Sequence, residues 1–132
     1  MIQDHVGELM RCVDIGIACI VVTGSDSDLK RVKDVLKIEL ADNGTLVGEI
    51  ELDSIEIELN HSEENTDLVL VSGLEALSPK DSIMYAIRSF LDLGKHTNLR
   101  SIIFCETYHY ANHFNDYDTP FYHFCFHYPI KD

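Results

Sequence analysis

Residues Ile17–Leu29 read IACIVVTGSDSDL, and this stretch decides the fold class that the sequence predicts. Its first part, Ile17–Val22, is a continuous apolar run rich in β-branched residues, which is typical of a strand covered on both faces. The polar turn Gly24–Asp28 follows, and Leu29 then begins an apolar face at helical spacing. A buried strand that leads through a short turn into a helix predicts an α/β domain.

The same two periodicities recur along the rest of the chain. Two further apolar runs, Leu68–Val71 and Ile102–Cys105, predict buried strands. Apolar residues at helical spacing predict helices over residues 2–14 and 78–94, the second with Ser78 as its N-cap. Because helices separate the three buried strands, we expect those strands to be parallel.

Two more elements are expected at the margins of this sheet. Residues 49–59 alternate glutamate with apolar side chains, and a change of phase at Asp53-Ser54 predicts an acidic β-hairpin. Residues 122–128 alternate aromatic with mixed side chains and predict a C-terminal strand. Residues 1–132 should therefore form a single α/β domain, with a mixed sheet of three buried strands, these two marginal elements and about three flanking helices.

The composition is that of an ordinary globular domain. Hydrophobic residues make up 45% and charged residues 25% of the chain, which suits a domain that buries a core. No segment reaches the roughly 18 consecutive apolar residues of a membrane span, and no signal peptide pattern opens the chain, so we expect a cytoplasmic protein without a membrane partner. Four cysteines without a C-x-x-C pair predict reduced thiols, and neither a disulfide framework nor a zinc ribbon.

The formal net charge is −13, from 23 acidic and 10 basic residues. A surface this negative repels nucleic acid and attracts basic proteins. Between Lys37 and Lys80 the chain contains eleven acidic residues and no lysine or arginine. The acids of the expected hairpin and its surroundings are the candidate contacts for a basic partner: Glu49, Glu51, Asp53, Glu56, Glu58, Glu63, Glu64 and Asp67.

These observations predict a non-enzymatic binding protein that needs no cofactor. Small size, high negative charge and the absence of G-x-S-x-G or G-x-x-x-x-G-K-[ST] motifs suit an immunity protein or antitoxin. Such a protein would occlude the basic surface of a toxin domain, for example a nuclease. Two alternatives stay open, namely a metal- or phosphate-binding enzyme and a regulatory subunit with a degenerate nucleotide-binding fold.

The phosphate alternative depends on the turn Gly24–Asp28. The segment Ile20–Val35 resembles the first strand, loop and helix of the carboxyaminoimidazole ribonucleotide mutase family, which has a flavodoxin-like fold. The resemblance implies that Ser25 and Ser27 contact a nucleotide phosphate and that Asp28 lies near the ribose. It covers sixteen residues, and the Ser-Ala-His-Arg stretch and the Gly-rich segment of that family are absent from the chain. We favour a capped helix start, because two carboxylates in this turn would repel an anion.

The metal alternative depends on the histidine-rich tail. Cys105, His109 and His113 are spaced four residues apart, as ligands on one helical face would be, and His123 and His127 would share one face of a strand. Imidazole and thiolate are the natural ligands of zinc. Ordinary packing competes with this interpretation, because half-buried histidines are common. A catalytic thiol at Cys105 is disfavoured, since the carboxylate that follows it would raise its pKa.

Overall fold

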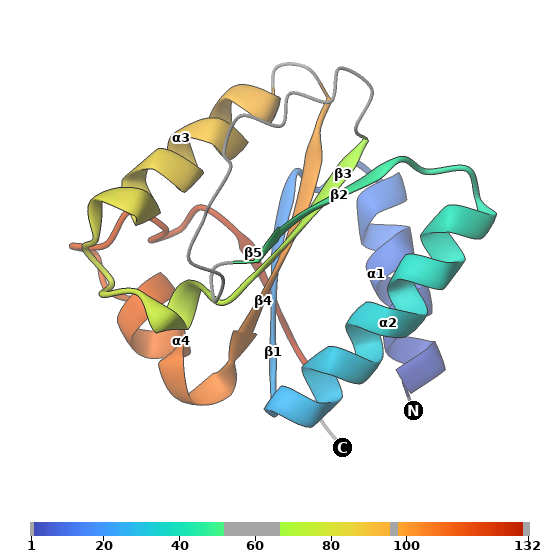
Figure 1. Ribbon diagram of the computed structural model, residues 1–132, viewed down its shortest axis with the longest axis horizontal. Helices are drawn as coiled ribbons and strands as arrows, with labels where there is room; N and C mark the ends of the chain where they lie inside the picture. The colour runs from blue at the N-terminus through green and yellow to red at the C-terminus, as the bar shows by residue number, and fades with distance from the viewer. Residues whose placement is uncertain (1, 52–66, 96–97, 131–132) are drawn as a thin grey trace.

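The computed structural model describes residues 2–51, 67–95 and 98–130, which form a five-stranded sheet between two layers of helices (Figure 1). This arrangement confirms the predicted α/β class. In chain order the elements are α1 (Ile2–Asp14), β1 (Cys19–Gly24), α2 (Asp26–Asp42), β2 (Val47–Glu51), β3 (Leu68–Ser72), the 3-10 turn η1 (Leu74–Ala76), α3 (Ser82–Lys95), β4 (Arg100–Glu106), α4 (Thr107–Phe114) and β5 (Phe126–Pro129).

The sheet has the order β2-β3-β4-β1-β5, and all of its described strand pairs are parallel, so the described sheet is not mixed as predicted. The three apolar runs that predict buried strands are β1, β3 and β4, which occupy the centre of the sheet. Helices α1 and α2 cover one face of the sheet, and α3 and α4 cover the other (Figure 1). Central strands covered on both faces have no solvent side, so both of their faces are apolar.

The alternation of side chains along β1 supplies both cores. Ile20 and Val22 pack with the residues of α1 and α2, whereas Cys19 and Val21 pack with those of α3 and α4. Successive side chains of a strand point to opposite faces, so one strand serves two cores. All four residues are at most 3% exposed.

The start of α3 differs from the sequence prediction. Ser78 is not its N-cap, because residues 78–81 form a turn in which the Asp81 amide donates to the Ser78 carbonyl. The helix begins at Ser82, and the Asp81 carboxylate accepts a 2.9 Å hydrogen bond from the Ile83 amide. Asp81 satisfies a first-turn amide itself, so the cap lies three residues later than predicted.

The two strands expected at the margins are the edge strands β2 and β5. Strand β2 pairs with β3, while the second arm of the predicted hairpin, residues 55–59, lies outside the described residues. The C-terminal strand is shorter than predicted, because hydrogen-bonded turns occupy residues 119–124 and His123 has a φ of 55°. A left-handed residue interrupts extended backbone, so the aromatic alternation before Cys125 does not belong to a strand.

One further helix, α4, lies between β4 and β5 and brings the described α-helices to four, against about three predicted. Helix α4 contains His109 and His113, whose spacing does place them on one helical face. Among the described residues, no helix combines the length and apolar character that crossing a bilayer requires.

Candidate functional site

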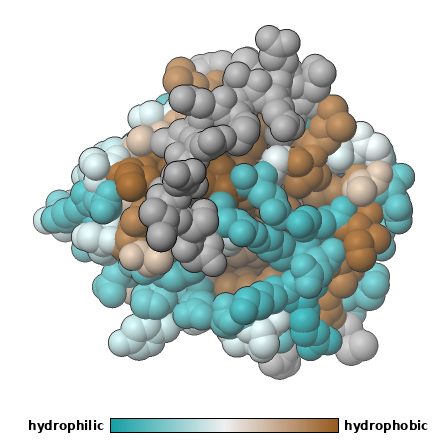
Figure 2. Space-filling view, in the orientation of Figure 1, coloured by the Kyte–Doolittle hydropathy of each residue, from teal (hydrophilic) through white to brown (hydrophobic). Residues whose placement is uncertain are grey.

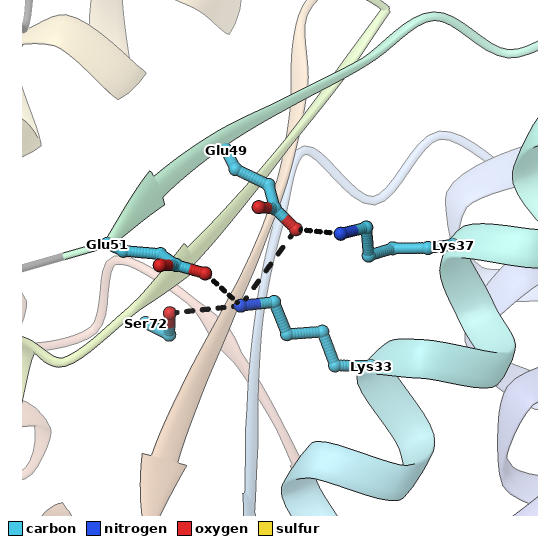
Figure 3. Close-up of polar contacts among 5 residues, drawn as sticks. All are labelled: Lys33, Lys37, Glu49, Glu51 and Ser72. Carbon is cyan, nitrogen blue, oxygen red and sulfur yellow. Dashed lines mark hydrogen bonds and ion pairs between the residues drawn. The ribbon is translucent and has the colours of Figure 1, made fainter.

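Lysines of α2 and glutamates of β2 form an ion-pair cluster at the β2 edge of the sheet (Figure 3). The Lys33 ammonium lies 3.1 Å from the Glu51 carboxylate and 3.9 Å from that of Glu49, and it donates a 3.3 Å hydrogen bond to the Ser72 hydroxyl. The Lys37 ammonium lies 2.7 Å from Glu49. Two lysines thus contact two glutamates and the last residue of β3.

Local geometry explains why these four charged side chains converge. Lys33 and Lys37 are four residues apart and therefore share one face of α2. Glu49 and Glu51 are two residues apart and therefore share one face of β2. Helix α2 packs on that face of the sheet, so each pair faces the other.

The cluster changes the interpretation of the acidic alternation in β2. The sequence predicts that Glu49 and Glu51 face solvent from a hairpin, but both carboxylates are paired with lysines of α2. The hydrogen bond to Glu49 raises the pKa of Lys37, which keeps this lysine protonated beside its partner. These two glutamates therefore hold the edge strand to α2, and part of their charge is neutralised inside the protein.

The other predicted contact residues divide into two groups. Asp67 precedes β3 and accepts a 3.1 Å hydrogen bond from the Leu46 amide, which joins the starts of β2 and β3. The remaining five lie outside the described residues: Asp53, Glu56, Glu58, Glu63 and Glu64. Of the eight predicted contacts, the structure thus describes three.

Two acidic residues that the sequence analysis did not select lie at the same edge. Glu39 and Asp42 belong to the last turn of α2, which contains no basic residue. The chain then turns through residues 43–45 and reaches Leu46, beside Asp67. A signal for these acids was present in the sequence, because both fall in the interval without lysine or arginine.

The turn at Gly24–Asp28 is a capped helix start, as we favoured from the sequence. Ser25 is the N-cap of α2, and its hydroxyl accepts a 3.2 Å hydrogen bond from the Asp28 amide. Asp26 pairs with Lys30 at 3.1 Å. The chain after β5 passes beside this turn, since the Ile130 amide donates a 2.7 Å hydrogen bond to the Thr23 carbonyl.

The turn also lies where open α/β sheets often bind ligands. The helix that follows β1 covers one face of the sheet, and the helix that follows β4 covers the other (Figure 1). The carboxyl ends of these two neighbouring strands therefore flank a topological switch point. Two carboxylates, Asp26 and Asp28, belong to the first turn of α2 there and already use its positive end.

Of the first three candidate metal ligands, the structure brings His109 and His113 together, with their rings edge to face and the ring centroids 5.9 Å apart. Burial and the Glu75 carboxylate raise the pKa of the fully buried Cys105 thiol, so it stays protonated and is a poor nucleophile or metal ligand. His113 is 4% exposed, and its two ring nitrogens lie 3.2 Å and 2.8 Å from the carbonyl oxygens of His109 and Leu77. The His109 ring lies 3.8 Å from the Glu106 carboxylate.

The last two candidate metal ligands, His123 and His127, have different contacts. His123 is exposed and stacks on Tyr122. His127 stacks on Tyr110, and its Nε2 lies 2.8 Å from the hydroxyl of the buried Thr23. Desolvation lowers the pKa of His127, so its ring is neutral at pH 7.

Across the described residues, no three histidine, cysteine, aspartate or glutamate side chains gather in a way that could hold a metal ion. Cys105 and His109 do not form a nucleophile and base either, because the thiol is buried and donates to the Glu106 carbonyl. The candidate site is therefore the group of charged side chains at the β2 edge. Comparison with protein-family models, curated proteins and solved structures found no match.

Proposed function

We propose that the protein is an acidic binding protein that occludes a basic partner protein, and that it acts as an immunity protein or antitoxin against a toxin domain. The contact surface would be the β2 edge of the sheet, where the last turn of α2 meets the starts of β2 and β3. The distribution of charge along the chain is the observation that carries this proposal.

Nearly all of the net charge comes from one part of the chain. The interval between Lys37 and Lys80 contributes eleven negative charges, while the rest of the chain contributes twelve acids against all ten bases. In the fold this interval runs from the end of α2 through β2 to β3 and η1. Among the described residues of this interval, Glu39, Asp42 and Asp67 lie where the last turn of α2 meets the starts of β2 and β3, and their charge would attract a basic protein and speed its association.

The position of Glu39 and Asp42 supports a role in binding. Carboxylates near the C-terminal end of a helix are unfavourable by about 0.3–1 kcal/mol each, because the helix dipole is negative there. No basic residue in the last turn of α2 offsets this cost. Acids that oppose folding stability in this way are what a surface selected for a cationic partner would contain.

Apolar side chains accompany these acids. Ile38 is 62% exposed and Leu46 is 53% exposed, and both flank the last turn of α2 along the chain. The space-filling view shows apolar surface beside hydrophilic side chains over the β2 side of the molecule (Figure 2). Protein interfaces combine an apolar centre with a polar rim, and this edge offers both.

Charge reversal at the C-terminal end of α2 tests the location of the contact surface. The double variant Glu39→Lys/Asp42→Lys should weaken binding of a fluorescent arginine-rich peptide by about tenfold, which corresponds to about 1.4 kcal/mol. The matched control is Asp4→Lys/Asp26→Lys at the opposite end of the helix layer, and both double variants change the net charge from −13 to −9. Anisotropy titrations at low and high salt measure both affinities, and equal losses would contradict a localised surface.

The immunity function needs a separate experiment in cells. The product of a neighbouring gene is expressed with and without this chain, and growth is measured. We expect the product to be toxic and the chain to restore growth, with weaker protection by Glu39→Lys/Asp42→Lys than by the control pair. A neighbouring product that is harmless, or toxicity that the chain does not relieve, would argue against an antitoxin.

A further inference from the structure

Two cysteines far apart in the sequence meet at the other edge of the sheet. Cys19 is the first residue of β1, and Cys125 immediately precedes β5. Their sulfur atoms lie 2.7 Å apart, although 106 positions separate the two residues. This separation is longer than a disulfide bond, about 2.05 Å, but shorter than the van der Waals contact of two sulfur atoms.

The strand register explains the meeting. Ile20 pairs with Phe126 and Val21 with His127, so the residues one step earlier, Cys19 and Cys125, are opposite each other. Both side chains also point to the same face of the sheet, because Cys19 belongs to the core beneath α3 and α4 and Cys125 packs against that core. Neighbouring strands lie about 4.8 Å apart, which falls within the Cα separation that disulfides span, about 4.4–6.8 Å.

We infer that Cys19 and Cys125 form a reversible disulfide, so that the β5 edge carries a redox-sensitive modification site. The oxidant is a small-molecule disulfide of the glutathione class. The partly exposed Cys125 thiolate attacks one sulfur of this disulfide, breaks its S–S bond and releases one thiolate. The Cys19 thiolate then attacks the Cys125 sulfur and expels the other half of the small disulfide as a second thiolate.

The exchange balances without any further reactant. Two electrons pass from the cysteine pair to the small disulfide, which leaves as two thiols. The two protons that Cys19 and Cys125 lose are taken up by the two departing thiolates. An excess of reduced small thiol reverses the reaction by the same two steps.

The other two cysteines are placed so that they do not compete. Cys105 pairs in register with Thr23, four residues further along β1 than Cys19, which is about 13 Å along a strand. Cys12 belongs to α1 and packs on the opposite face of the sheet. Only one of the six cysteine pairings therefore fits the fold.

The bond would fasten an edge of the sheet. Strand β5 contributes four residues and pairs with β1, and the chain that leads into it runs through turns. A covalent link at Cys125 fixes the residue from which β5 begins. Oxidation should therefore slow the local opening of β5, and reduction should restore it.

The experiment is oxidation of the folded protein with oxidised glutathione, followed by unfolding in denaturant, alkylation of the remaining thiols and peptide mapping. We expect the loss of two hydrogen atoms from the intact mass and one cross-linked peptide that joins Cys19 to Cys125, with Cys12 and Cys105 alkylated. Cys12→Ser should oxidise like the original protein, whereas Cys125→Ser should not form the cross-link. A stable glutathione adduct on Cys125, a different pairing, or full alkylation of all four thiols would overturn the inference.

Hydrogen exchange separates this site from a cross-link formed only in unfolded chains. The Ile130 amide, which bonds to the Thr23 carbonyl beyond the end of β5, should exchange more slowly in the oxidised protein than in the reduced protein. The Cys125→Ser variant supplies the control, since its exchange should not respond to oxidised glutathione. Faster or unchanged exchange on oxidation would contradict a disulfide that fastens the folded edge.

Discussion

The two edge strands of the sheet are held in opposite ways. Strand β2 is attached to α2 by partly exposed ion pairs between two lysines and two glutamates. Strand β5 carries no charged side chain in its span, FHYP, and is attached by ring stacking and hydrogen bonds. On one face His127 contacts Tyr110 and Thr23, and on the other the Tyr128 hydroxyl donates to Glu8 and lies 2.9 Å from His5 Nδ1.

The difference shows that two edge strands of one sheet can be held by interactions that respond to different conditions. Ion pairs near water contribute little stability and weaken with salt, but they leave a charged surface available for a partner. Stacked rings and half-buried hydrogen bonds are insensitive to salt and hold a short strand more firmly. We therefore expect β2 to respond to ionic strength, and β5 to respond to pH and, through the adjacent thiol pair, to redox conditions.

The largest loss of stability among the edge-strand variants should come from His127→Ala. The substitution removes the stacking on Tyr110 and leaves the hydroxyl of Thr23, which is 1% exposed, without this partner. The free energy of unfolding should fall by about 2 kcal/mol, measured by urea denaturation at pH 7.5. The loss should be the same at low and high salt, and a loss that vanished in salt would show that β5 is also held by charge.

A double-mutant cycle checks the physical cause of that loss. Thr23→Val removes the buried hydroxyl, so adding it to His127→Ala should recover part of the lost stability. Additive losses in the two single variants would show that the hydrogen bond contributes nothing, and that stacking alone supports the histidine.

A smaller effect, which salt should screen, is expected from Lys33→Met. Methionine keeps the unbranched apolar stem of the side chain but leaves Glu49 and Glu51 side by side without the shared ammonium. The free energy of unfolding should fall by about 1 kcal/mol in low salt, and by less in about 1 M salt, where the screening length is about 3 Å. The matched control is Lys30→Met, whose pair with Asp26 is exposed and should contribute almost nothing.

The smallest effect should be the pH dependence contributed by His127. Desolvation holds its folded pKa below the unfolded value of about 6.5, so the unfolded chain binds more protons in this range. The stability from the neutral ring is therefore complete above about pH 6.5 and is lost as the pH falls below it. Urea titrations at several pH values should show a shallower decline for His127→Gln, and an unchanged decline would contradict the assignment to this ring.

Local sequence signals predicted much of the fold. The apolar runs at β1, β3 and β4 identified the three central strands, because a strand buried on both faces leaves a continuous hydrophobic run. The polar turn before α2 was correctly predicted to be a capped helix start, and the cap is Ser25. The same reasoning misplaced the start of α3, because Ser78 and Asp81 both fit a cap and only the backbone conformation distinguishes them.

The candidate site was predicted less well. Alternation in β2 indicated a half-exposed strand but not what its outer face would meet, so the pairing of Glu49 and Glu51 with lysines of α2 was missed. The tail left metal binding and ordinary packing both open for a related reason. Histidine spacing is compatible with metal binding, whereas the fold directs His113 to two backbone carbonyls and His127 to Thr23.

The sequence by itself determined the elements and the uneven distribution of charge, because hydrophobic periodicity and the order of charged residues are properties of neighbouring positions. Only the tertiary structure decided which elements are neighbours. The strand order β2-β3-β4-β1-β5 places Cys19 beside Cys125 and places α2 over the glutamates of β2. Such contacts join residues far apart along the chain, and they form because every apolar face must be covered at once, which no single segment specifies.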